Sequence, residues 1–386
     1  MKSVWASLAA ALAIAAPAQP QTATREGNYW IATRSGAVQA GPRLKIVTRG
    51  AVTLRGENRP EVAYTVRERV RSANARDARE LIAKIGLKAV YDKGWTVVFV
   101  QLPANVDGAA DVEVRAPKQL KEAVIDSQLG SIEAYDIDGS LLAKTAAGQI
   151  RIDRIHGMAR VGTGGGDVHI GRVDGPIKAF SGGGSITASS LGGNAYLETA
   201  GGEIAVSEAM GNVQASAGTG GNIRIQRAAG DAVLSTGGGV IDAARVKGLV
   251  RAKTDTGSIK VRSADSVDLT SGTGQIRIQE VRGIMQATTV MGCIVAELPA
   301  GKLMQDSLLS TQSGDITVYI PSNFAMTVDA MNTSPGGHRI FSEFPEIKTQ
   351  LAGGNMRSQA QGSLNGGGAT LRLAAQGGTI FLRRRR

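Results

Sequence analysis

The chain has one cysteine, three histidines and few aromatic side chains among its 386 residues. The single cysteine, Cys293, excludes an intramolecular disulfide, so packing and hydrogen bonds must hold the fold together. Three Trp, six Tyr and six Phe are too few for a thick aromatic core. The core must therefore be thin and made of Ile, Val, Leu and Ala, which suits stacked strands.

Motifs of catalysis and metal binding are also missing. The sequence contains no H-E-x-x-H, C-x-x-C, G-x-S-x-G or G-K-[ST] pattern. We expect structural or solvent-facing roles for His156, His169 and His338. Calcium-binding repeats need Asp at a fixed place in each turn, whereas these turns hold Thr, Ser, Ala and Gly. The sequence therefore predicts no cofactor, no metal site and no catalytic residue.

Glycine, by contrast, is abundant, and many of the glycines recur at a regular spacing. From Gly130 to Gly292, a Gly followed two residues later by Ile or Val returns about every 18 residues. When that Gly is counted as position zero, positions two and four are apolar in every repeat. This alternation places the apolar side chains on one face of a strand. A fixed short period indicates a repeat architecture, in which each unit buries its apolar face against its neighbours.

A second strand follows in each repeat, and a Thr/Ser column comes directly after it. We expect these hydroxyls to satisfy turn amides and one another. The column consists of Thr163, Ser181, Thr199, Thr236, Thr254, Ser271 and Thr289.

The pattern predicts an all-β fold, a parallel β-solenoid of about ten 18-residue coils with two strands in each coil. Three-strand left-handed hexapeptide helices also complete a turn in 18 residues, but their apolar residue recurs every six. A right-handed path agrees with the general preference for right-handed crossovers.

The N-terminus has the pattern of a secretory signal peptide over residues 1–18. Lys2 precedes an apolar segment at 4–16, and Ala18 fits the small-x-small cleavage rule. The apolar segment is shorter than the ~20 residues of a membrane span. The pattern predicts an exported protein, periplasmic, cell-surface or extracellular, with no transmembrane segment after cleavage.

The rest of the chain divides into four parts. Residues 19–41 are a leader, 42–126 are a β-rich region, 127–300 are the solenoid repeats, and 301–386 are a C-terminal coil and cap with a basic tail. A short helix is expected at 73–85 within the β-rich region. Its apolar residues recur at helical spacing, and Ser72 or Asn74 can cap its start.

The order of three motifs resembles a known family. The strand at 111–117 leads into Gly-x-Ile repeats beginning with Gly130-Ser131-Ile132, and the segment 313–321 closes the series. In this layout, over about residues 40–386, the chain is similar to the bacterial putative-adhesin family of exported β-strand-repeat proteins. The resemblance implies the solenoid architecture. That family has no assigned biochemical function, so no catalytic residue can be transferred from it.

Net charge is +11, and basic residues recur at outward positions of the coils. On neighbouring coils they would lie ~5 Å apart and form a cationic stripe suited to an extended polyanion. Ordinary solvated strand faces are the alternative explanation. The candidate binding residues are Arg151, Arg224, Lys260 and Arg277 at position three, and Arg154, Arg172, Arg227 and Arg245 at position six. The terminal run Arg383–Arg386 is expected to prevent the preceding strand from pairing edge to edge with other chains.

These features favour a non-enzymatic binding or adhesion protein that presents a cationic surface. The expected partner is an anionic polysaccharide or another cell-envelope component; no specific nucleic acid and no oligomeric state are predicted. A polysaccharide-active parallel β-helix enzyme, a lyase or hydrolase, is the first alternative, although it needs clustered carboxylates that do not recur on adjacent coils here. The second alternative is a structural spacer of the envelope.

Overall fold

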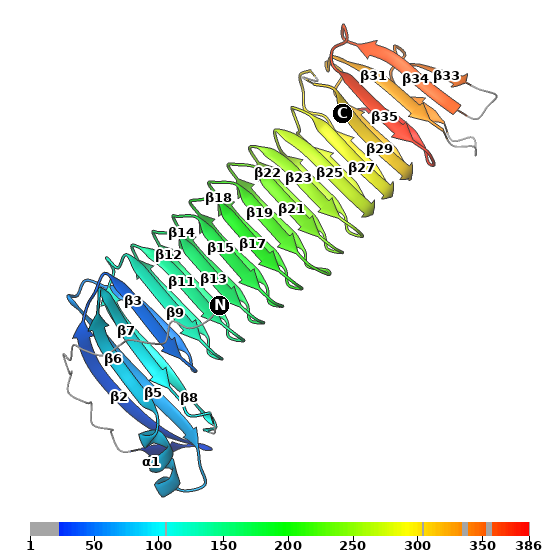
Figure 1. Ribbon diagram of the computed structural model, residues 1–386. Helices are drawn as coiled ribbons and strands as arrows, with labels where there is room; N and C mark the ends of the chain where they lie inside the picture. The colour runs from blue at the N-terminus through cyan, green and yellow to red at the C-terminus, as the bar shows by residue number, and fades with distance from the viewer. Residues whose placement is uncertain (1–22, 105, 303–304, 334–338, 353–356, 386) are drawn as a thin grey trace. The chain divides into compact units, whose positions relative to one another are not determined.

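The computed structural model describes residues 23–104, 106–302, 305–333, 339–352 and 357–385 (Figure 1). The protein is all-β with one helix and forms a parallel β-solenoid of about 11 turns with coils of roughly 18 residues. The predicted all-β parallel solenoid and its two strands per coil are confirmed, and the right-handed path stays a prediction. The predicted signal peptide at 1–18 lies outside the described residues. The chain divides into unit 1, up to Gly175, and unit 2, from Pro176, and each is described by itself.

Unit 1 contains two facing sheets. Sheet A contains β1 (Thr24–Glu26), β2 (Tyr29–Gln39), β4 (Val52–Glu57), β5 (Glu61–Arg71), β8 (Gly108–Pro117), β10 (Ile132–Ile137), β12 (Ile150–Ile155) and β14 (Val168–Val173). Sheet B contains β3 (Arg43–Thr48), β6 (Gly86–Asp92), β7 (Trp95–Gln101), β9 (Glu122–Ser127), β11 (Ser140–Thr145) and β13 (Ala159–Thr163). Strands β1 and β2 occupy residues assigned above to the leader.

One coil of unit 1 is out of chain order. Strand β3 pairs in parallel with β7 on one side and with β9 on the other. Strand β4 likewise lies between β8 and β10. The coil β3–β4 is therefore inserted between two coils that come later in the sequence. It forms backbone hydrogen bonds with strands on both sides that are far from it along the chain. Strands β2 and β5 extend sheet A with antiparallel pairing.

The helix α1 (Ala75–Ala83) confirms the helix expected at 73–85. Asn74 is its N-cap, and the side-chain oxygen of Asn74 accepts a hydrogen bond from the Asp77 amide at 2.9 Å. Ala78 and Ile82 form its buried face.

Glu68 is a buried carboxylate at an inward position of β5. Its side chain is 0% exposed and forms an ion pair with Arg34 of β2. Arg34 also donates a hydrogen bond to the Ile85 carbonyl at 3.0 Å. Within the described residues, Oε2 of Glu68 and Nε of Arg34 have no hydrogen-bond partner. Burial raises the pKa of Glu68, and the Arg34 guanidinium opposes that shift without cancelling it.

The raised pKa of Glu68 makes folding stability depend on pH. Below the ordinary value of 4.5 both folded and unfolded chains hold this proton. As pH rises, the unfolded chain ionises first, so the free energy of unfolding falls until the folded carboxyl ionises as well. Glu68→Gln should remove up to about 1.4 kcal/mol per pH unit of this slope. Urea unfolding of both proteins between pH 4 and 8 measures it; parallel profiles would contradict the assignment.

Unit 2 repeats the two-sheet arrangement, and Figure 1 shows the strands of its sheet B side by side. Sheet A contains β16 (Ile186–Leu191), β18 (Ile204–Ala209), β20 (Ile223–Ala228), β22 (Ile241–Val246), β24 (Ile259–Ser263), β26 (Ile276–Gln279), β28 (Ile294–Glu297), β30 (Ile316–Ile320), β32 (Ile340–Ser342) and β36 (Ile380–Arg384). Sheet B contains β15 (Ile177–Ser181), β17 (Ala195–Thr199), β19 (Val213–Ala217), β21 (Ala232–Thr236), β23 (Leu249–Thr254), β25 (Ser266–Thr273), β27 (Met285–Met291), β29 (Ser307–Ser313), β31 (Met326–Asn332), β33 (Lys348–Ala352), β34 (Arg357–Leu364) and β35 (Thr370–Ala375).

At the C-terminal end of unit 2, the order of the strands in the sheets also differs from their order in the sequence. Strand β35 pairs in parallel with both β29 and β31, and β36 pairs with both β30 and β32. The last coil of the chain therefore enters between two earlier ones. This insertion places the arginines at the end of β36 on the outer face of sheet A.

The corners carry a repeated hydrogen-bond pattern. In the coil around β21, Thr236 Oγ1 donates to the Gly221 carbonyl at 2.7 Å and accepts from the Gly239 amide at 3.2 Å. The predicted Thr/Ser column is thus confirmed, but its hydroxyls bind backbone groups of the glycine anchors rather than one another. The same pattern recurs at Thr145, Thr163, Thr199 and Thr254.

The anchor glycines are required for space. A Cβ built on Gly221 would overlap the carbonyl oxygen of Gly202 in the preceding coil, whereas a Cβ on the adjacent Gly220 meets nothing within 4 Å. Gly221→Ala should therefore lower the free energy of unfolding by about 1–3 kcal/mol. Gly220→Ala is the matched control and should change it by less than about 1 kcal/mol. Equal stability of the two variants in urea unfolding would refute the close-approach argument.

Candidate functional site

The candidate site is the outer face of sheet A in unit 2. Along β20, exposed and buried residues alternate as far as position four, and then positions five and six both face solvent. Gln226 and Arg227 occupy these two positions, before the buried Ala228. Each coil can therefore present two neighbouring outward side chains in addition to the one at position three.

Strand register places cations next to one another on this face. Arg227 pairs with Arg245 across β20 and β22, and Lys260 pairs with Arg277 across β24 and β26. Register partners on adjacent strands lie ~4.8 Å apart, where like charges repel. The structure thus brings together two pairs of the predicted residues of unit 2, Arg227 with Arg245 and Lys260 with Arg277. Arg224 lies instead between Ala205 and Asp242.

Several of these cations have acidic neighbours. The ion pairs are Arg224–Glu203 at 2.7 Å, Arg227–Glu208 at 3.3 Å, Arg262–Asp242 at 2.6 Å and Arg277–Glu297 at 3.8 Å. Arg245 and Lys260 form no ion pair within the described part of the chain. Exposed ion pairs stabilise a fold by only about 0–1 kcal/mol, so these arginines can exchange an acid for a ligand at little cost.

Two adjoining hollows mark this face. One, of about 500 Å³, is lined by Arg227, Arg245, Arg262 and Arg385 among others, and the second, of about 820 Å³, by Arg277 and residues 383–385. They share Glu297 and Arg385, and we call them together the arginine groove. Its lining carries seven arginines and three glutamates: Arg227, Arg245, Arg262, Arg277, Arg383, Arg384 and Arg385, with Glu280, Glu297 and Glu343.

The predicted cations of unit 1 are more fully neutralised. Arg154 makes two hydrogen bonds to Asp136, at 2.6 and 2.9 Å, and an ion pair with Asp153. The bond to Arg154 lowers the pKa of Asp136. Arg172 is paired with Asp174 at 2.8 Å. In the same unit, Arg151 lies in register with Glu133 on one neighbouring strand.

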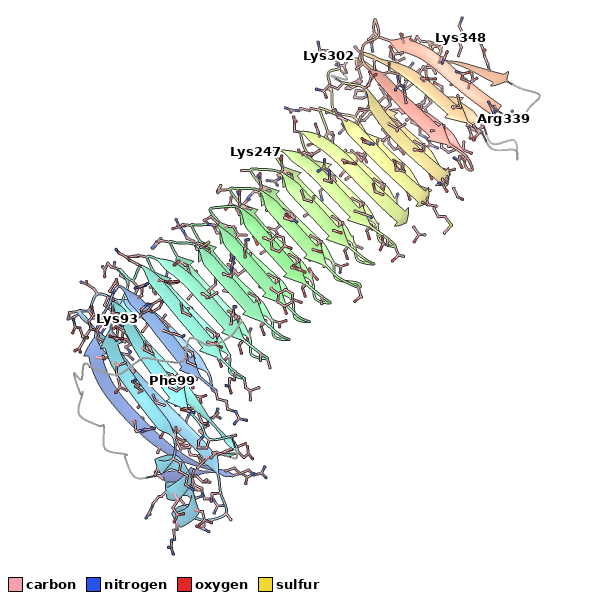
Figure 2. The ribbon with its side chains drawn as sticks, viewed as in Figure 1. Lys93, Phe99, Lys247, Lys302, Arg339 and Lys348 are labelled. Carbon is pink, nitrogen blue, oxygen red and sulfur yellow. The ribbon has the colours of Figure 1, made fainter. Side chains whose placement is uncertain are left out.

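Positive charge also lies outside this face. Figure 2 shows Lys247 and Lys302 at turns along one edge of unit 2, with Arg339 at the opposite edge. These side chains extend the basic character of the unit but do not line the arginine groove.

The repeat pattern did not predict all of the residues that line the groove. Arg262 lies at position five, next to the columns that the sequence analysis used. Arg383 lies in register with Tyr319 only because β36 pairs with β30, a pairing that no period in the sequence encodes. Arg385 reaches back to donate a hydrogen bond to the Leu298 carbonyl at 2.8 Å.

Over the described ranges, no three His, Cys, Asp or Glu side chains are grouped so that they could hold a metal ion. No helix in the same ranges is long and apolar enough to cross a membrane.

One family model matches part of the chain. Residues 210–381 match the family model described as Toastrack DUF4097, which confirms the resemblance to adhesin-like domains of unknown function. No curated protein sequence matches the chain.

Several solved structures align with the chain at low identity and with low TM-scores. One is a putative cell adhesion protein from Clostridium sporogenes, with 8% identity, 92% of this chain and 100% of that chain covered, and a TM-score of 0.18. Another is a putative adhesin from Bacteroides fragilis, with 12% identity, coverage of 69% and 94%, and a TM-score of 0.22. A putative lipid binding protein from Parabacteroides distasonis has 13% identity, coverage of 76% and 94%, and a TM-score of 0.27.

Proposed function

We propose that this chain, whose residues 210–381 match the Toastrack DUF4097 family model, is an exported, non-enzymatic binding protein. Its ligand is an anionic polymer of the cell envelope or matrix, which lies along the arginine groove. The observation that carries this proposal is the excess of seven arginines over three glutamates on one face of sheet A.

The arrangement suits an extended ligand more than a compact one. Arginines on successive strands repeat at ~4.8 Å, so a chain of anionic groups can meet several guanidinium groups in turn. Guanidinium groups bind carboxylates through two parallel hydrogen bonds, which gives each contact strength and direction. The acids that now pair with Arg227 and Arg277 are exposed enough to be displaced.

The carboxylates of the groove support binding more than catalysis. Glu297 accepts a hydrogen bond from Gln279 at 3.1 Å and pairs with Arg277, and Glu343 accepts the Arg384 amide at 2.8 Å. Glycosidases place two carboxyl groups about 5–10 Å apart across the scissile bond, one of them with a raised pKa. Both glutamates already accept hydrogen bonds from groups of the protein itself.

Neutralising the groove tests the proposal. The triple variant Arg227→Gln, Arg245→Gln, Arg262→Gln should bind polygalacturonate at least tenfold more weakly at low salt, a loss of about 1.4 kcal/mol. Binding by the unaltered protein should itself weaken as salt rises, because exposed charges are screened. Titration calorimetry at two salt concentrations measures both effects.

A second triple variant controls for net charge. Lys178→Gln, Arg251→Gln and Lys253→Gln remove the same charge from the outer face of sheet B in unit 2, and should leave affinity within twofold. Equal weakening by both variants would show attraction to overall charge and refute the groove. Release of unsaturated or reducing sugar ends by the unaltered protein would refute the non-enzymatic role.

A further inference from the structure

A stacked aromatic pair lies at the C-terminal end of sheet A in unit 2. Phe341 of β32 and Phe381 of β36 are register partners, with ring centroids 5.7 Å apart and planes inclined by 14°. Phe341 is 53% exposed. Within the described residues β32 pairs with β36 alone, so the Phe341 ring lies at the edge of the sheet. In a chain this poor in aromatics, an exposed stacked pair contributes little to the core.

The pair adjoins the arginine groove. The guanidinium of Arg383 lies over the Phe381 ring, 5.0 Å from its centroid, and Arg383 also lines the 820 Å³ hollow. That hollow includes the side chains of Tyr319 and Ser322 and the carboxylates of Glu297 and Glu343. Apolar ring surface, cations and hydrogen-bonding groups therefore meet in one place.

We propose that Phe341, Phe381 and the adjoining hollow form a subsite for one uronate ring of an acidic polysaccharide. This assignment rests on the proposed binding of an anionic polymer by the arginine groove and names the class of that polymer. The C–H face of the sugar packs on the aromatic pair, and its carboxylate meets Arg383 or Arg384. Its hydroxyl groups bind Glu343 and Tyr319, which flank Arg383, whereas Glu297 lies farther along the groove, within reach of the next sugar ring.

A sugar fits these groups better than other polyanions do. A polypeptide of acidic residues or a polyphosphate has no ring to cover Phe341. A single-stranded nucleic acid has rings to stack and phosphates for the arginines, but Glu297 and Glu343 would repel its backbone and have few donors to bind. Sugar hydroxyls are donors as well as acceptors, so they satisfy carboxylates and arginines side by side.

The test compares three polymers on the full-length protein: polygalacturonate, polyglutamate and oligo(dT). Phe341→Ala should lower affinity for polygalacturonate at least fivefold and leave affinity for polyglutamate within twofold. Phe341→Tyr should retain the affinity because it keeps the ring. Phe180→Ala removes another exposed ring, 45% accessible, from sheet B and should leave both affinities unchanged. Thermal unfolding by circular dichroism checks that each variant remains folded.

The outcomes separate the two proposals. If polygalacturonate and polyglutamate both bind and Phe341→Ala alters neither, the subsite is refuted while the polyanion function stands. If neither binds, the polyanion function fails, and the subsite fails with it. Tighter binding of oligo(dT) than of polygalacturonate, lost in Phe341→Ala, would overturn the sugar assignment in favour of nucleic acid.

Discussion

A corner hydroxyl between two glycines is the interaction on which the rest of this structure depends. Each coil must turn sharply between its sheets, which leaves a buried amide and a buried carbonyl at the anchor glycines. The Thr236 hydroxyl donates to the anchor carbonyl that opens its own coil and accepts from the anchor amide that opens the next coil, so neither buried polar group is left unpaired. Because the neighbouring backbone occupies the place of a Cβ, only glycine fits the anchor.

That constraint fixes strand register, and register fixes the surface. Side chains alternate with a period of two, so a slip of one residue would turn the apolar columns outward and bury the arginines. With the anchors aligned, Arg227 and Arg245 are held on adjacent strands. The inserted coil β35–β36 then brings Arg383 and Phe381 to the same face. The proposed binding surface thus depends on both the repeat and the out-of-order insertion of β35–β36.

The sequence predicts the repeat well and the ends less well. The Gly-x-Ile spacing and the Thr/Ser column define the coil and its corners, since both are local patterns repeated many times. The acidic partner of Arg154 could also have been found, because Asp136 lies one coil earlier at the same position. The insertions of β3–β4 and β35–β36 could not, since alternating strands can pair with any coil. The stacked pair of Phe341 and Phe381 beside the groove was missed for that reason.

The most direct measurement is the stability of corner variants that differ only in the hydroxyl. Thr236→Val keeps the shape of the side chain but removes the donor to Gly221 and the acceptor for Gly239. It should lower the free energy of unfolding in urea by about 1–3 kcal/mol and speed amide exchange at Gly239. Thr236→Ser keeps the hydroxyl and should retain most of that stability. If Thr236→Val proves as stable as Thr236→Ser, the corner hydroxyl does not hold the coils in register and the account is wrong.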